Sequence, residues 1–143
     1  MWYGEYVHTL DNKDRFILPA RFRQEIKKRK IKKFYLTRGL EGCLFLFAEE
    51  DWKRIEERLR TLPFTKQQAR YFNRLYFSGA YEVRLDSQGR ILIPQHLKDF
   101  AKINKEIVII GIADRIEIWD KAQWKEFYER NRKNFEEMAE NIF

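Results

Sequence analysis

A chain of 143 residues is long enough for one domain or two very small ones. Apolar residues make up 44% of it, including 12 Phe, 7 Tyr and 4 Trp, so a packed core is expected and a wholly disordered chain is excluded. No stretch approaches the ~20 apolar residues that span a bilayer, and the first residues lack the pattern of a signal peptide. The single cysteine, Cys43, excludes an internal disulfide, and we therefore expect a cytoplasmic protein.

The net charge of +7 is unevenly distributed along the chain. Residues 1–75 carry 18 basic and 10 acidic side chains, whereas residues 76–143 carry 11 and 12. A basic half favours a polyanionic partner, most simply nucleic acid. The alternative at this point is that the excess charge only keeps the protein in solution.

An internal repeat organises the chain. Shifting the sequence by 75 residues aligns residues 2–22 with 77–97, and after a shortening by three residues the match resumes at Gly39/Gly111 and continues to Trp52/Trp124. The identical pairs in the first block are Gly4/Gly79, Tyr6/Tyr81, Leu10/Leu85, Asp11/Asp86, Arg15/Arg90 and Pro19/Pro94. We expect a first repeat over 2–60, a helical connector over 61–76, a second repeat over 77–132 and a helical tail over 133–143.

The two copies predict the same succession of elements. An extended segment leads into a polar turn, a short apolar strand follows, and a proline then stands where a helix begins. In the first copy these elements are Tyr3–Leu10, Asp11–Asp14, Arg15–Leu18 and Pro19; in the second they are Gly79–Leu85, Asp86–Gly89, Arg90–Ile93 and Pro94. The first helix, "PARFRQEIKKRK", ends in bases that suit the negative end of its dipole.

The second half of each copy predicts a hairpin and a closing helix. Gly39 and Gly111 mark the expected bends, and Asp120 is the expected N-cap of a helix over 121–140. The connector contains a further helix, "TKQQARYFNRLYF", whose aromatic residues favour burial over base stacking. Strands this short leave exposed edges, so we expect the copies to pack as a pseudo-twofold unit, with further subunits completing the assembly.

Residues that could support catalysis are few. His8 and His96 have no second ligand at metal-binding spacing, Cys43 precedes an apolar strand, and no phosphate-binding loop or nucleophile motif is present. Most carboxylates lie at helix starts or in i,i+4 pairs, which are usually solvated. We therefore expect no enzyme, no cofactor and no metal.

The repeated turn places an aspartate four residues before an arginine. We expect Asp11 and Asp86 to be structural, accepting hydrogen bonds from the turn and pairing with the arginine. Asp14 aligns with Gly89, which indicates a shared left-handed backbone position.

The basic side chains near these turns are the candidates for binding DNA. Arginine matches phosphate and the guanine edge with its two-pronged guanidinium. The candidates are Lys13, Arg15, Arg21, Arg23 and Arg90, of which the four in the first copy could converge on one exposed patch. The counterparts Gln88, His96 and Lys98 make a weaker set, and Lys27–Lys33 is either a solvated helix end or a non-specific phosphate contact.

With these residues in place, the chain resembles the MraZ family of bacterial transcriptional regulators. The segments "GEYVHTLDNKDRFILPARFR" and "SGAYEVRLDSQGRILIPQHLK" are similar to its two signature segments, each built around Asp-x-x-x-Arg. The wider resemblance is to AbrB-like (SpoVT-AbrB, swapped-hairpin) DNA-binding domains. It implies an α+β fold in which two tandem β-α-β units form a pseudo-twofold β-barrel core with flanking helices.

The resemblance also implies a function. It implies a ring-like homo-oligomer in the nucleoid that binds repeated double-stranded sites upstream of the division and cell-wall genes, usually as a repressor of transcription. The signature residues fall on Asp11, Arg15, Asp86 and Arg90, whereas Lys13, Arg21 and Arg23 follow from charge and position alone. Two alternatives stay open, an antitoxin-type scaffold that binds an acidic partner and a regulator that binds RNA.

Overall fold

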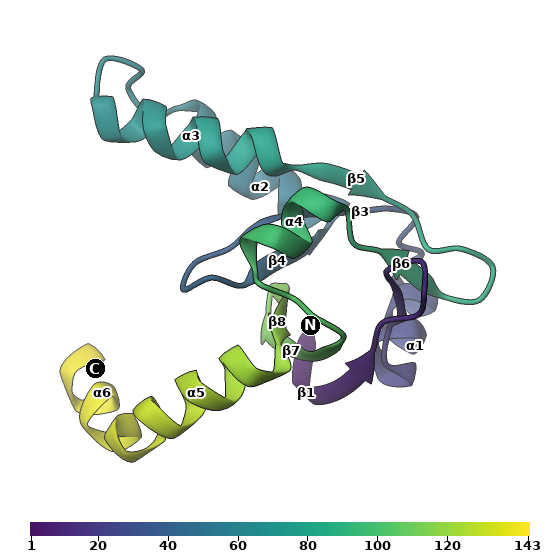
Figure 1. Ribbon diagram of the computed structural model, residues 1–143. Helices are drawn as coiled ribbons and strands as arrows, with labels where there is room; N and C mark the ends of the chain where they lie inside the picture. Colours follow the sequence, from purple (N-terminus) through teal and green to yellow (C-terminus); the bar gives the residue numbers. More distant parts are fainter.

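The computed structural model describes residues 1–143 (Figure 1). The first copy contains β1 (Trp2–Thr9), β2 (Arg15–Ile17), α1 (Ala20–Arg29), β3 (Phe34–Arg38), β4 (Leu44–Ala48) and α2 (Glu49–Arg60), followed by α3 (Gln67–Gly79). The second contains β5 (Tyr81–Val83), β6 (Arg90–Leu92), α4 (Gln95–Phe100), β7 (Glu106–Ala113), β8 (Arg115–Asp120) and α5 (Lys121–Asn131). A 3₁₀ turn η1 (Arg132–Asn134) and α6 (Phe135–Ile142) end the chain.

The two copies exchange strands. The main sheet has six antiparallel strands in the order β1-β7-β8-β4-β3-β5, so β1 of the first copy pairs with β7 of the second, and β5 of the second pairs with β3 of the first. A separate two-stranded ribbon joins β2 to β6, with Phe16 opposite Ile91, its own counterpart in the repeat. Because each copy supplies an edge strand to the other, neither completes its sheet alone, and the expected pseudo-twofold α+β arrangement is present.

The closed barrel that the resemblance implied is not observed. The strands form an open six-stranded sheet and a separate ribbon, because β1 and β5 stand at opposite ends of the sheet order and do not pair with each other. The two outer strands are also unequal, since β1 pairs along eight residues whereas β5 pairs along three.

One hydrophobic core joins the copies. Trp2, Phe16 and Phe22 from the first copy and Ile91 and Leu97 from the second are almost fully buried in one cluster. Trp2 packs edge-on against Phe22 at 5.2 Å between ring centroids. Removal of these side chains from water is the main favourable term of folding, so the shared core joins the two copies in addition to the shared sheet.

The connector helix α3 packs through a smaller aromatic cluster. Trp52 of α2 stacks on Tyr35 of β3 at 4.9 Å and on Tyr76 of α3 at 5.6 Å. The helix predicted in the connector is present, but Tyr71 and Phe72 on it remain exposed. Helices α2 and α3 project together from the sheet as one arm (Figure 1).

Several predicted boundaries were wrong. Gly111 lies inside β7 rather than at a bend, because any Cβ there would collide with the backbone of Trp2 and Tyr3 in β1; the turn falls at Ala113, which has φ 56°. Gly79 ends α3 instead of opening an extended segment. The helix expected over 121–140 breaks at η1, where the Asn131 side chain donates to the Phe127 carbonyl at 2.8 Å.

Other local predictions hold. Pro19 and Pro94 directly precede α1 and α4, and the Asp120 carboxylate accepts hydrogen bonds from the Ala122 and Gln123 amides at 3.1 and 3.3 Å. That carboxylate is the N-cap of α5. No helix is both long enough and apolar enough to cross a membrane.

Candidate nucleic-acid interface

The first repeated turn is held by the Asp11 carboxylate. Its Oδ1 accepts hydrogen bonds from the Lys13 and Arg15 amides, both at 2.9 Å, and its Oδ2 accepts one from Arg15 Nε at 2.9 Å. The Asp11 amide donates to the Arg15 carbonyl at 2.8 Å. One aspartate therefore satisfies the backbone of the turn and fixes the first part of the arginine side chain.

The second turn repeats this geometry. Asp86 Oδ1 accepts from the Gln88 and Arg90 amides at 2.9 Å each, and Oδ2 accepts from Arg90 Nε at 2.7 Å. Asp14 and Gly89 have φ 60° and 76°, the left-handed conformation that their alignment predicts. The repetition of every hydrogen bond shows that the two turns are one local structure built twice.

Both carboxylates are held in the charged state. Hydrogen bonds from the backbone, first of all that of Arg15, lower the pKa of Asp11 below its usual value. The pKa of Asp86 is lowered in the same way, chiefly by the Arg90 amide.

The two turns lie against each other. The Leu18 amide donates to the Gly89 carbonyl at 3.2 Å, and the Ile93 amide donates to the Asp14 carbonyl at 2.9 Å. Arg90 Nη1 is 3.8 Å from Asp11 Oδ2, the same oxygen that Arg15 Nε contacts. The signature arginines of both copies thus meet at one carboxylate, and the paired turns form a single site.

The residues beside the paired turns differ between the copies. Lys98 Nζ contacts Asp14 Oδ1 at 2.8 Å, so its charge is neutralised. Its counterpart Arg23 faces Gly89, which has no carboxylate, and instead donates from Nε to the Leu18 carbonyl at 3.0 Å. Exchanging Asp for Gly in the turn therefore leaves the cation of the first copy unpaired.

The five candidate DNA-binding residues fall into three settings. Lys13 and Arg23 are exposed and form no ion pair within 4.0 Å. Arg15 and Arg90 are held by the aspartates with side chains 26% and 24% exposed, and their terminal nitrogens make no hydrogen bond within the chain. Arg21 lies apart, lining a hollow with Met1 and Tyr3, so the structure brings four candidates together and not the fifth.

His8 lies near this site, beside Arg23. Burial, and then the charge of Arg23, lower the pKa of His8 below its usual value. The sequence does not indicate that His8 and Arg23 are neighbours, because His8 is on β1 and Arg23 is on α1, and only the folded chain brings the two side chains together.

The remaining chemically versatile groups lie elsewhere. Cys43 is buried and its Sγ contacts the Leu40 carbonyl at 3.2 Å, and burial raises the pKa of this thiol far above its usual value. His96 Nε2 lies 3.2 Å from the Gly79 carbonyl. No group of three His, Cys, Asp or Glu side chains is placed to hold a metal ion.

The fold and the site together define a class of protein, an α+β protein of two tandem repeats that exchange strands and join two Asp-x-x-x-Arg turns into one basic site. The family model described as "MraZ protein, putative antitoxin-like" matches residues 1–75 and again residues 76–143. The chain belongs to the MraZ family.

Proposed function

We propose that this protein is a sequence-specific DNA-binding regulator of transcription. It acts as a repressor by binding repeated sites upstream of the division and cell-wall gene cluster, in the cytoplasm and at the nucleoid. The observation that carries the proposal is the junction of the paired turns, where Arg15 and Arg90 share the Asp11 carboxylate and Lys13 and Arg23 stand beside them unpaired.

The geometry suits contact with a duplex. Because Asp11 and Asp86 hold Arg15 and Arg90 through Nε, the terminal nitrogens of both guanidinium groups remain available for a phosphate or a guanine edge. Holding each side chain in advance reduces the entropy lost on binding. Lys13 and Arg23 add charge that attracts the phosphate backbone.

The strand exchange supports the assignment to AbrB-like swapped-hairpin domains. In this proposal residues 2–60 and 77–132 are the two units, joined by the connector 61–76 and followed by the tail 133–143. Two chains would each supply one unit in a dimeric relative, whereas here β1 and β5 exchange between units of one chain. The protein functions by binding, without an enzymatic activity, a metal or a cofactor.

The proposal includes a ring-like homo-oligomer. Helix α6 exposes Phe135, Met138 and Ile142 and carries three glutamates but no base. An apolar groove of about 330 Å³ lies between α2, α3 and β4 and is lined by Phe45, Leu59 and Phe72 among others. Its charged lining residues are Arg58, Arg115 and Asp114, of which Arg115 pairs with Glu117 at 3.0 Å and with Asp114 at 3.9 Å.

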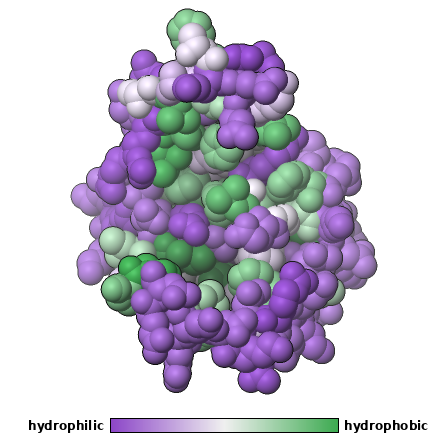
Figure 2. Space-filling view, turned by 90° about the vertical axis from the view of Figure 1, so that its left-hand side faces the viewer, coloured by the Kyte–Doolittle hydropathy of each residue, from purple (hydrophilic) through white to green (hydrophobic).

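The groove and the helix support a head-to-tail contact between copies. Apolar side chains gather across the face that the α2–α3 arm and the C-terminal helices flank (Figure 2). The apolar face of α6 in one subunit matches the groove of the next in hydrophobicity, and the groove offers its glutamates one base without an ion pair, Arg58. A head-to-tail contact of this kind forms a ring when the rotation that relates neighbouring subunits brings the last subunit back to the first.

Binding to the DNA upstream of the protein's own gene tests the proposal. A gel-shift titration should show retardation of that duplex at concentrations where a scrambled duplex of equal length stays free, and single-stranded RNA should compete poorly. Absence of any shift at low salt would favour an antitoxin-type scaffold with an acidic partner. Equal competition by RNA would favour an RNA-binding regulator.

A further inference from the structure

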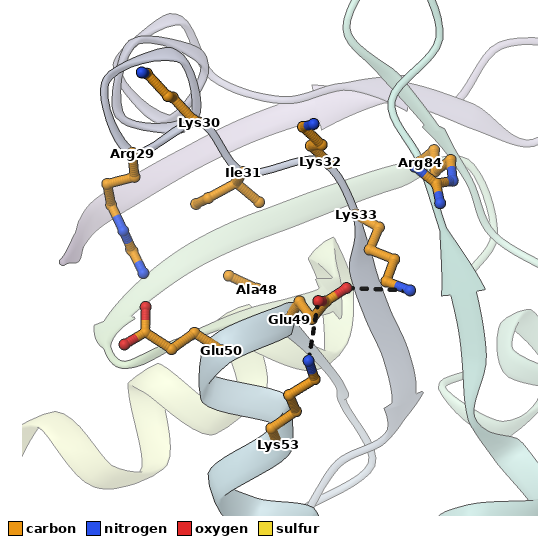
Figure 3. Close-up of a pocket in the computed structure, with 10 residues that line it drawn as sticks. All are labelled: Arg29, Lys30, Ile31, Lys32, Lys33, Ala48, Glu49, Glu50, Lys53 and Arg84. Carbon is orange, nitrogen blue, oxygen red and sulfur yellow. Dashed lines mark hydrogen bonds and ion pairs between the residues drawn. The ribbon is translucent and has the colours of Figure 1, made fainter.

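A second basic site lies at the far end of α1. A hollow of about 650 Å³ lies between four segments: the end of α1, the residues that lead into β3, the first turn of α2 and the residue that follows β5 (Figure 3). Six basic side chains line it: Arg29, Lys30, Lys32, Lys33, Lys53 and Arg84. Glu49 and Glu50 are the acids among its lining residues, and Glu82 and Asp51 pair with two of the lining cations, so six cations less four carboxylates leave the hollow a net charge of about +2.

Three of the six cations are held by carboxylates. Lys33 Nζ contacts Glu82 at 2.7 Å and Glu49 at 3.1 Å, and Lys53 Nζ contacts Glu49 at 3.2 Å. Arg29 lies 3.7 Å from Asp51. The hydrogen bond to Glu82 raises the pKa of Lys33, so this ammonium group stays charged as part of the wall.

The other three cations have no such partner. Lys30, Lys32 and Arg84 are exposed and form no ion pair within 4.0 Å. Figure 3 shows Lys30 and Lys32 on the segment after α1 and Arg84 across from them on the end of the β5 segment. Lys32 and Arg84 lie opposite each other across the hollow, and Lys30 stands at its rim (Figure 3). These three cations are free to contact a bound anion.

The backbone conformation at Lys30 explains why the basic segment Lys27–Lys33 divides between two surfaces. Lys30 adopts a left-handed conformation, φ 55°, and its amide caps α1 by donating to the Ile26 and Lys27 carbonyls. Beyond it the chain is extended, so Ile31 packs against the core while Lys30 and Lys32 face outward. Lys28, earlier in the run, lines the separate hollow beside Arg21.

The hollow lies within reach of a duplex bound at the paired turns. Helix α1 runs from the first turn to the hollow and has ten residues, a length of about 15 Å. A DNA duplex carries roughly nine phosphate charges over that length. The second turn is also close in sequence to the hollow, because Arg84 lies two residues before Asp86, which opens that turn. Each turn is therefore connected to the hollow by a short segment of chain.

We propose that the hollow is a second contact site for the phosphodiester backbone of duplex DNA, in which Lys30, Lys32 and Arg84 bind phosphates without reading sequence. This inference rests on the proposed function and adds to it a division of labour. The paired turns select the sequence, and the hollow adds affinity for any duplex.

The test is the salt dependence of DNA binding. The intact protein and its K30Q/K32Q/R84Q variant are titrated with a fluorescent upstream duplex and an unrelated duplex of equal length, over a series of salt concentrations. The control is the variant K66Q/K125Q/K133Q, which removes the same charge from exposed, unpaired lysines on other elements. Circular dichroism and native mass establish that all three proteins have the same fold and assembly.

The hollow variant should bind both duplexes at least about tenfold more weakly at moderate salt, and its slope of log affinity against log salt should fall by about 0.9 for each phosphate that the protein no longer binds. The control should keep the slope of the unmodified protein. Equal slopes for the hollow and control variants would overturn the inference and leave the proposed function intact. Loss of preference for the upstream duplex at unchanged slope would also overturn it, since the hollow would then read bases. If the unmodified protein binds neither duplex, the proposed function itself fails.

Discussion

At the scale of single residues, the aspartates and arginines of the repeated turn have different parts to play. Asp11 and Asp86 each accept two backbone hydrogen bonds and one from an arginine side chain, so their oxygens are used within the fold. Arg15 and Arg90 use Nε in this way, and their terminal nitrogens make no hydrogen bond within the chain, although Arg90 Nη1 lies 3.8 Å from Asp11 Oδ2. The aspartates therefore determine the shape of the site, and the arginines are the residues that the proposed function assigns to DNA contact.

Substitution of Asp11 should separate the contribution of the backbone hydrogen bonds to stability from that of the ion pair with Arg15. Asp11→Ala removes the oxygen that accepts from both backbone amides, together with the ion pair, and should lower the melting temperature more than Asp11→Asn, whose side-chain oxygen still accepts from the turn. Thermal unfolding followed by circular dichroism measures the difference. If both variants melt with the unmodified protein, the turn does not depend on this side chain.

Stability should fall in acid because both aspartates have lowered pKa values in the fold. Their contribution is complete above the ordinary carboxyl pKa of about 4 and is lost as the pH falls through the lowered folded values. Urea unfolding at a series of pH values should show this decline, and the double variant D11N/D86N should show less of it. An equal acid decline in both proteins would assign the effect to other carboxylates.

Local sequence was a sufficient guide to the turns but not to their surroundings. The Asp-x-x-x-Arg spacing and the Asp14/Gly89 alignment predict backbone geometry because a turn depends on a few consecutive residues. The pairing of Lys98 with Asp14, the placing of Arg23 over Gly89 and the separation of Arg21 depend on contacts across the copies. The position of Arg84 in the hollow was not predicted for the same reason, because the other residues that line the hollow lie more than 30 residues away in the chain.

At the scale of elements, the exchange of β1 and β5 is what joins the copies. The repeat and the short strands predict that the copies pack together, and helix starts at Pro19, Pro94 and Asp120 follow from local signals. The prediction of a bend at Gly111 was wrong because a glycine can allow two backbone segments to approach closely as well as form a turn. Only the position of β1, a strand about a hundred residues earlier, distinguishes the two uses.

Gly111 should therefore tolerate no side chain. Gly111→Ala places a Cβ against the backbone of Trp2 and Tyr3 and should cost roughly 2–3 kcal/mol of unfolding free energy by forcing β1 away from β7. Gly42→Ala is the control: this glycine has φ 79° but open space around it, so the cost should be about 1 kcal/mol from backbone strain. Chemical denaturation compares the two, and an equal cost would contradict a close-packed β1–β7 pair.

At the scale of the whole molecule, the structure suggests how weak contacts could combine. One chain presents one joined site, and the exposed apolar residues of α6 and the groove beside α2 offer surfaces for a second copy. Several sites on one particle raise the effective concentration of each for neighbouring sequence repeats. The sequence predicts an assembly from exposed edges, but the surfaces that could form it become visible only in the folded chain.

Charge placed on α6 should dissociate the particle without unfolding the chain. Met138→Lys with Ile142→Lys adds bases to exposed apolar positions that would face the arginine-bearing groove of the next subunit. Native mass spectrometry should then show a smaller particle with an unchanged melting curve, and affinity for DNA with repeated sites should fall by about 100-fold or more. An unchanged mass would place the subunit contact elsewhere.

The comparison of Arg15→Ala with Arg21→Ala in DNA binding tests the central claim most directly. Both substitutions remove one arginine from the same segment, but Arg15 lies at the joined turns and Arg21 lies apart. In fluorescence anisotropy at one salt concentration, Arg15→Ala should lose the preference for the upstream duplex over a scrambled one, with native mass unchanged, while Arg21→Ala keeps it. Retained preference in Arg15→Ala, or its loss only in Arg21→Ala, would contradict the assignment of sequence reading to the paired turns.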